Sequence, residues 1–262
     1  MDRFDAKAAY ALVEKQVGYG QRPAGSPRLR RLAAELRRSM PNARFEAIPG
    51  EPRLRNVVSV LPGREPGIVV GAHYDTLVKP RGFVGANNGA AGTAVVVEVA
   101  RALQRTTADP ESRQVDFVLF DGEEPAAGRP EEGADFYNEG LRGSHAYVAA
   151  HPGETEAMVL LDYVGNRGLR LPREASSTEE LWNRLLIAAE AVGAERFFSN
   201  QTGPAIIDDH TPFLRAGVPA VDLIDWSYPG HSLADGLDRI SPHSLDAVGE
   251  TIVRLVEELR SE

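Results

Sequence analysis

Short apolar segments alternate with helical segments along most of this 262-residue chain. Residues 67–72, for example, form an apolar run between glycines, which is typical of a strand buried on both faces. Such alternation predicts an α/β fold in one domain spanning residues 1–262, with a mostly parallel central mixed sheet and helices on both faces. The expected strands are residues 55–61, 67–72, 115–120, 157–161 and 219–224. The expected helices are residues 4–17, 29–40, 89–103, 143–150, 178–192, 213–217 and 241–259.

The composition limits the classes of partner. A net charge of -9 argues against nonspecific binding to nucleic acid or to anionic membranes. No apolar run approaches the ~20 residues that a membrane-spanning helix needs. The absence of cysteine excludes disulfides and cysteine-ligated zinc. We therefore expect a soluble protein of undetermined oligomeric state. No signal peptide is visible, so it is either cytoplasmic or secreted with its leader removed.

Side chains that bind metals follow four of the expected strands. They are His73, Asp75, Glu123, Glu124, Asp162 and His231. Taken alone, each has an ordinary interpretation, such as a core histidine or a solvated acid. However, the carboxyl ends of parallel strands meet at one edge of a sheet, where sites of α/β proteins form. Imidazole and carboxylate together are a ligand set for Zn²⁺. The constellation therefore predicts a zinc site at this edge.

The same residues resemble those of a known family, the zinc-dependent exopeptidases of the aminopeptidase type, with the closely related glutaminyl cyclases. The resemblance covers nearly the whole chain, and the ordered set of motifs is specific although no single motif is. These motifs are residues 22–26, 55–58, 73–75, 82–89, 120–124, 141–144, 160–162, 208–214 and 230–235. The family resemblance implies a zinc-exopeptidase-like fold and an enzyme that removes N-terminal residues from a peptide or small amide substrate.

The resemblance also implies roles for the strand-end residues. His73 and Asp162 are expected to bind one zinc ion, and Glu124 and His231 a second. Asp75 is expected to hold His73 in the correct tautomer. Glu123 is expected to act as the general base, taking a proton from water and passing it to the leaving amine.

Asn88 departs from the family pattern, which places a bridging aspartate there. An amide offers one good acceptor oxygen and no charge, so two nearby dications would be less well compensated. Three accounts remain open: the change inactivates the enzyme, the site holds a single zinc, or Asn88 deamidates because Gly89 leaves its carboxamide unhindered. One or two zinc ions per chain are therefore expected.

Two activities and a non-enzymatic role remain open. Cyclases of this group use one zinc and usually carry tryptophan beside the metal-binding histidine, whereas Gly230 precedes His231 here. Residues 125–130 also lack aromatic side chains, so an aminopeptidase is favoured over a glutaminyl cyclase. A catalytically weak peptide-binding pseudoenzyme is the third interpretation.

Several further residues are candidates for substrate contact. An acidic side chain can bind a substrate ammonium group, and aromatic or branched side chains can form the wall of a pocket. The candidates are Asp209, Phe83, Ile207, Trp226 and Tyr228, with Asp208, Phe136, Tyr137 and Ile206 as weaker ones.

Overall fold

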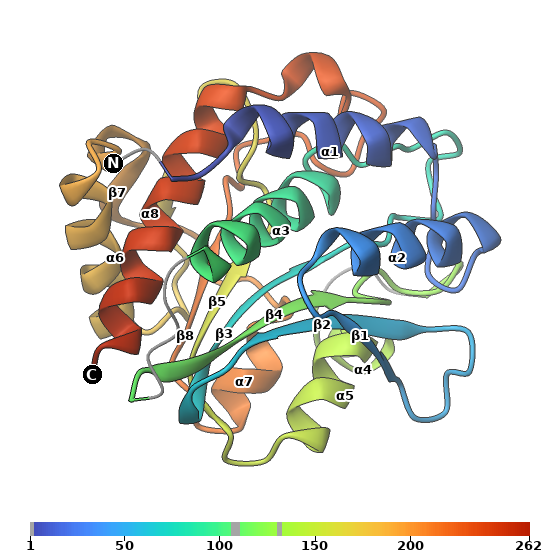
Figure 1. Ribbon diagram of the computed structural model, residues 1–262. Helices are drawn as coiled ribbons and strands as arrows, with labels where there is room; N and C mark the ends of the chain where they lie inside the picture. Colours follow the sequence, from blue (N-terminus) through green and yellow to red (C-terminus); the bar gives the residue numbers. More distant parts are fainter. Residues whose placement is uncertain (1–2, 106–110, 130–132) are drawn as a thin grey trace.

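The computed structural model describes residues 3–105, 111–129 and 133–262, and these residues form a twisted sheet between layers of helices (Figure 1). In this described part, the main sheet has six strands in the order β1-β2-β4-β3-β5-β8. β3, β4, β5 and β8 pair in parallel, while β1 and β2 add to one edge in antiparallel fashion. The expected mixed α/β sheet is therefore confirmed. The strands are β1 Arg44–Ala47, β2 Arg55–Leu61, β3 Arg64–His73, β4 Arg113–Phe120, β5 Thr155–Leu161 and β8 Ala220–Leu223.

Helices cover both faces of the sheet (Figure 1). α1 (Ala6–Gly18), α2 (Pro27–Ser39), α3 (Ala90–Gln104) and α8 (Pro242–Arg260) lie on one face, and α5 (Arg142–Ala150) and α7 (Thr211–Arg215) lie on the other. α6 (Glu179–Ala191) packs beside α8. The remaining elements are α4 Gly133–Glu139, the 3-10 turns Glu195–Phe197 and Leu237–Arg239, and a small parallel pair formed by β6 Leu171–Arg173 and β7 Phe198–Thr202.

The residues of β3 show why the central strands are apolar throughout. Ile68, Val70 and Ala72 join the core under α1, α3 and α8. Val69 points to the opposite core, which includes Phe120. Because successive side chains alternate between faces, a strand covered by helices on both sides needs apolar residues at every position. The parallel strands β3, β4, β5 and β8 then end at one edge, which positions the predicted site.

Some elements differ from expectation. β1, β6, β7 and α4 were not predicted; β1 alternates between polar and apolar residues, but it is only four residues long and none of its side chains is buried, so the signal is weak. Residues 125–141, to which the sequence assigned no helix or strand, contain α4, and residues 130–132 of that segment lie outside the described part. Thr178, the first residue of the expected helix 178–192, is the N-cap residue of α6, but its hydroxyl accepts from the Ala220 N–H and makes no capping hydrogen bond. Among the described helices, none is long and apolar enough to cross a membrane.

Candidate metal and catalytic site

Three carboxylates surround His73 at the carboxyl end of β3. Its Nε2 atom lies 3.4 Å from Asp162 Oδ1. Its Nδ1 atom lies 3.5 Å from Asp75 Oδ1 and 3.7 Å from Glu123 Oε2. These residues come from the ends of β3, β4 and β5 and are all buried. The structure therefore brings together four of the residues that the sequence placed at one sheet edge.

Asp75 fixes the turn that carries the Glu-Glu pair. Its Oδ1 accepts from the Glu123 N–H at 3.2 Å, and its Oδ2 accepts from the Glu124 N–H at 3.2 Å. Both carboxylate oxygens of Asp75 are thus used by the backbone of one turn, while Oδ1 also faces the His73 ring. Asp75 consequently sets the positions of His73, Glu123 and Glu124 relative to one another.

The density of buried acids changes the protonation of the site. Burial raises the pKa of Glu123 well above its usual range, and the neighbouring charge of Glu124 raises it further. Burial also raises the pKa of Glu124 and of Asp162. For His73, burial opposes the charged form, but the carboxylates of Glu123, Asp162 and Asp75 outweigh it and raise its pKa. A cation placed here would favour the ionised carboxylates.

Among the predicted metal ligands, four buried polar atoms lack a hydrogen-bond partner within the described structure. They are His73 Nδ1, Asn88 Oδ1, Glu124 Oε1 and Asp162 Oδ1. Buried polar atoms without a partner are costly, and a bound ion or water normally satisfies them. The donor chemistry of imidazole and carboxylate fits zinc. In the described residues, however, no three His, Asp or Glu side chains already form a group that could hold a metal ion.

Asn88 sits beside this cluster in a tightly held loop. Its amide Nδ2 donates to the Tyr163 hydroxyl at 3.3 Å, and hydrogen bonding with Asn88 favours the ionised form of Glu124. The next residue, Gly89, has φ of +85°, and a Cβ there would lie 2.7 Å from the Asp75 carbonyl and 3.1 Å from the His73 ring. Only glycine therefore permits this loop to pack against His73.

His231 lies apart from the buried cluster, in an adjoining pocket of about 380 Å³. Tyr163, Trp226, Tyr228 and His231 line this pocket. The Trp226 ring stacks on Tyr163 with centroids 6.3 Å apart, and the His231 ring meets Tyr163 edge-on at 6.5 Å. His231 is exposed. Because Tyr163 also contacts Asn88, it connects this pocket to the cluster around His73.

The other predicted contact residues are less accessible. Phe83 is fully buried, and Asp209 is fully buried with its Oδ1 accepting from the Ser144 hydroxyl. Ile207 is half-buried and does not line the pocket of Trp226 and Tyr228. Trp226 and Tyr228 do line it. The substrate roles of Phe83, Asp209 and Ile207 remain predictions.

Sequence reasoning missed residues that support the site. Asp235 accepts from the N–H groups of Asn87 and Asn88 and from the Tyr228 hydroxyl, so it ties the Asn88 loop to the pocket wall. Arg22 is fully buried and donates to the carbonyls of Tyr74, Val84 and Gly85, which holds residues 82–89 in place. Burial lowers the pKa of Arg22 to about 10. Asp235 and Arg22 both lie within the family motifs given above. Their place in those motifs was the only sign in the sequence that they support the site.

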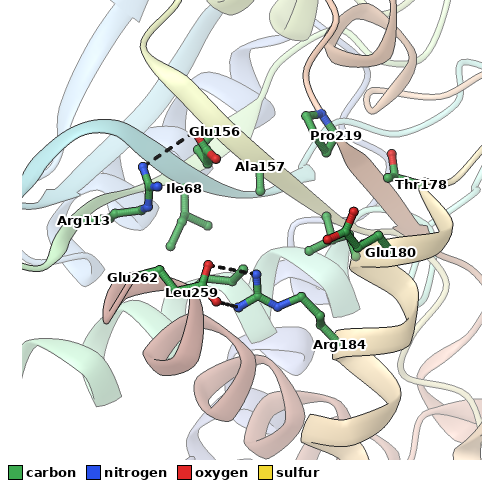
Figure 2. Close-up of a pocket in the computed structure, with 11 residues that line it drawn as sticks. Ile68, Arg113, Glu156, Ala157, Thr178, Glu180, Arg184, Pro219, Leu259 and Glu262 are labelled. Carbon is green, nitrogen blue, oxygen red and sulfur yellow. Dashed lines mark hydrogen bonds and ion pairs between the residues drawn. The ribbon is translucent and has the colours of Figure 1, made fainter.

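A second cavity, of about 180 Å³, lies at the opposite ends of the strands (Figure 2). Figure 2 shows Arg113 and Glu156 from the starts of β4 and β5, facing Arg184 of α6 and Glu262 after α8. The predicted site residues do not line it. It is therefore separate from the cluster around His73.

The fold and the site together define an α/β protein with a carboxylate and imidazole cluster at the carboxyl ends of parallel strands. The chain belongs to peptidase family M28, whose model matches residues 56–256.

Curated proteins with two different activities are similar to this chain. Aminopeptidase YwaD from Bacillus subtilis is 30% identical over 215 residues, which are 74% of this chain and 42% of that protein. Glutaminyl-peptide cyclotransferase from Bos taurus is 26% identical over 230 residues, 75% of this chain and 64% of that protein. The chain thus spans less than two thirds of the length of these curated relatives.

A solved structure supports the fold assignment. The crystal structure of Acidobacteriales bacterium glutaminyl cyclase superimposes with a TM-score of 0.82 at 27% identity, over 99% of this chain and 96% of that one. The zinc exopeptidase and glutaminyl cyclase fold expected from the motifs is therefore confirmed.

Proposed function

We propose that this protein is a zinc-dependent aminopeptidase that removes the N-terminal residue from a peptide or small amide. The observation that carries the proposal is the position of Glu123. Its buried carboxylate lies 3.7 Å from His73 Nδ1 and directly beside Glu124, whose Oε1 atom has no partner in the described structure. One acid can thus hold a metal while its neighbour serves as a base.

The residues that would hold zinc are those with orphaned donor atoms, together with His231. His73 and Asp162 would hold one ion, and Glu124 and His231 a second, with Asn88 Oδ1 as a weak neutral ligand. Zinc, when bound, supplies Lewis-acid polarisation of the substrate carbonyl and lowers the pKa of water. His231 would have to turn toward Glu124, because it is exposed in the structure.

Glu123 would perform the proton transfers of hydrolysis. A water oxygen forms a bond to the carbonyl carbon while Glu123 takes the water proton. The carbon–nitrogen bond then breaks, and Glu123 returns the proton to the leaving amine. Asp75 keeps Glu123 in place through the Glu123 N–H. The exposure of His231 and Trp226 leaves the pocket open to water, which favours hydrolysis over a reaction that must exclude it.

Glutaminyl cyclisation is the second candidate. In that reaction the substrate's α-amine attacks its own γ-carboxamide carbon and ammonia leaves. Asn88 supports this candidate, because without a bridging charge a single zinc is easier to hold than two. Trp226 also supports it, since its ring stacks on Tyr163 and would enclose a small folded glutamine.

Turnover of two substrate types separates the candidates. Zinc-reconstituted protein should hydrolyse aminoacyl-nitroanilides and unblocked peptides, and it should leave N-terminal glutamine peptides uncyclised by mass spectrometry. If the protein formed cyclised product and hydrolysed no substrate, the aminopeptidase proposal would be wrong and the cyclase would take its place. Zinc binding with neither product would indicate the pseudoenzyme, and absence of zinc binding at micromolar zinc would exclude the proposed metal site.

A further inference from the structure

Trp226 lies between the pocket that contains His231 and a neighbouring groove, which is distinct from the cavity in Figure 2. It lines the pocket that contains His231, and it also lines a larger groove of about 610 Å³. Its side chain is 44% exposed, and one face of its ring stacks on Tyr163. A chain that leaves the pocket across Trp226 would therefore enter this groove, which we call the Arg170–Arg196 groove.

Two guanidinium groups give the Arg170–Arg196 groove its charge. Arg170 and Arg196 both line it and both are exposed. Arg196 lies over the ring of Phe197 at 4.9 Å and contacts His243. The side chain of Arg170 makes no ion pair with the described part of the chain. Arg170 contacts Asp225 only through its backbone N–H.

Asp225, the acid that lines this groove, makes no ion pair with Arg170 or Arg196 in the described structure. Asp225 is only 2% exposed. Its Oδ1 accepts from Ser227, and its Oδ2 accepts from Asn166 and from the backbone of Arg170. Both oxygens of the Asp225 carboxylate thus accept hydrogen bonds from neighbouring loop residues. Although the whole chain carries a net charge of -9, the groove next to the site presents two available cations.

We propose that the Arg170–Arg196 groove binds a carboxylate of the peptide substrate downstream of its N-terminal residue. The inference rests on the proposed action at peptide N-termini. With the first residue beside Tyr163 and the chain crossing Trp226, the following residues extend ~3.3–3.6 Å each into the groove. Arginine matches carboxylate in a bidentate geometry. The substrate class is therefore an acidic peptide, whose carboxylate comes from an Asp or Glu side chain or from a short peptide's C-terminus.

Matched peptides test the proposal. Each keeps the same N-terminal residue, carries Asp or Asn at its third, fourth or fifth position, and ends in a free acid or an amide. For the wild type, we expect KM to be about tenfold lower for the carboxylate-bearing member, with kcat unchanged. The Arg170→Gln/Arg196→Gln double variant should lose this preference and keep its kinetics on neutral amidated peptides. Asp peptides ending in an amide and neutral peptides ending in a free acid separate the two sources of carboxylate.

A binding measurement keeps the test independent of turnover. The fluorescence of Trp226, identified with a Trp226→Phe variant, should respond to acidic peptides at lower concentration than to neutral ones, and the difference should shrink with added salt. Arg184→Gln, at the far end of the sheet, is the matched control and should retain the preference. Absence of turnover with a retained binding preference would reject the proposed function but keep the groove. An identical preference in the wild type and the double variant would overturn the groove assignment.

Discussion

The two ends of the parallel strands satisfy their charged side chains in opposite ways. At the carboxyl ends, Glu124 and Asp162 are buried, and each has an oxygen without a hydrogen-bond partner in the described structure, although Asp162 Oδ1 lies 3.4 Å from His73 Nε2. At the amino ends, Arg113 pairs with Glu156 at 3.6 Å, and Arg184 pairs with Glu262 at 2.6 Å (Figure 2). Glu156 and Glu262 are half exposed, at 50% and 54%. One end therefore carries unsatisfied buried charge, and the other carries ordinary surface pairs.

This difference distinguishes the proposed reactive site from a stabilising surface. A buried acceptor without a partner costs about 1–3 kcal/mol, and more if it is charged. A surface ion pair contributes only ~0–1 kcal/mol. A bound ligand can compensate this cost, and buried acids with strongly shifted pKa values cluster at functional sites. The cavity in Figure 2 has charges as well, but four of them are paired with one another: Arg113 with Glu156, and Arg184 with Glu262.

The strongest contrast is expected between the same substitution at the two ends. Glu123→Gln removes the proposed base and should reduce turnover by ~10²–10⁴-fold while leaving zinc content unchanged. Glu156→Gln, the control at the amino ends, should keep wild-type kinetics. Steady-state kinetics and elemental analysis on both variants measure this. If Glu123→Gln retained most of the activity, the base would have to be sought elsewhere.

A buried acid with a full set of partners sharpens the comparison. Glu174 is 1% exposed, yet it accepts from Ser176, Ser177 and Ile206 and lies 3.4 Å from His210 Nε2. Burial alone would raise its pKa, but the hydrogen bonds from His210, Ser176 and Ile206 prevail and lower it from 4.5 to about 2. The pKa of Glu174 is thus shifted in the opposite direction from those of Glu123, Glu124 and Asp162.

The lowered pKa of Glu174 predicts a pH-dependent stability. Its contribution should be complete above pH ~4.5 and lost as the pH falls toward 2, because the unfolded state binds the proton first. Glu174→Gln should therefore lower the free energy of unfolding by roughly 3 kcal/mol at pH 7. In urea titrations of both forms between pH 7 and pH 3, the difference in the free energy of unfolding should shrink steadily as the pH falls below ~4.5. A constant difference across that range would mean that charge is not the source of the effect.

The sequence predicted the strand-end part of the site because it depends on a simple regularity. Parallel strands end at a common edge, so His73, Glu123 and Asp162 had to lie near one another once β3, β4 and β5 were recognised. The apolar runs of these strands made them recognisable. β1 was missed because a short, half-exposed edge strand carries no such pattern.

The loop contacts could not be predicted in the same way. Asp235 holds the Asn88 loop across 147 residues of sequence, and no local pattern encodes that partner. The burial of Phe83 and the exposure of His231 likewise depend on how the loops fold over the edge. Two of the loops, residues 82–89 and 230–235, resembled family motifs, but resemblance alone did not give the orientation of their side chains.

Substitution of Asn88 tests whether the missing bridging charge limits zinc binding and turnover at the carboxyl ends of the strands. Asn88→Asp adds one negative charge with almost no change in shape. It should raise zinc binding toward two ions per chain and turnover by at least about tenfold, equivalent to ~1.4 kcal/mol. Asn87→Asp, one residue away, is the charge-matched control. Calorimetric zinc titration and kinetics on protein checked for deamidation by mass spectrometry measure both. Equal stoichiometry and rates in the wild type and Asn88→Asp would indicate a single-zinc enzyme and favour cyclisation.

The smallest effect is expected at the amino ends of the strands. Arg184→Ala removes a pair with Glu262 and a weaker contact with Glu258 at 3.5 Å. Because these groups remain partly in water, their attraction is screened and should be worth no more than ~1 kcal/mol, part of which is lost packing of the arginine stem. Zinc content and kinetics should not change. Thermal unfolding at low and high salt separates the two contributions, with Glu262→Gln as the partner variant. A large change in turnover from Arg184→Ala would connect the two ends of the sheet, and the distinction between a reactive and a merely charged end would no longer hold.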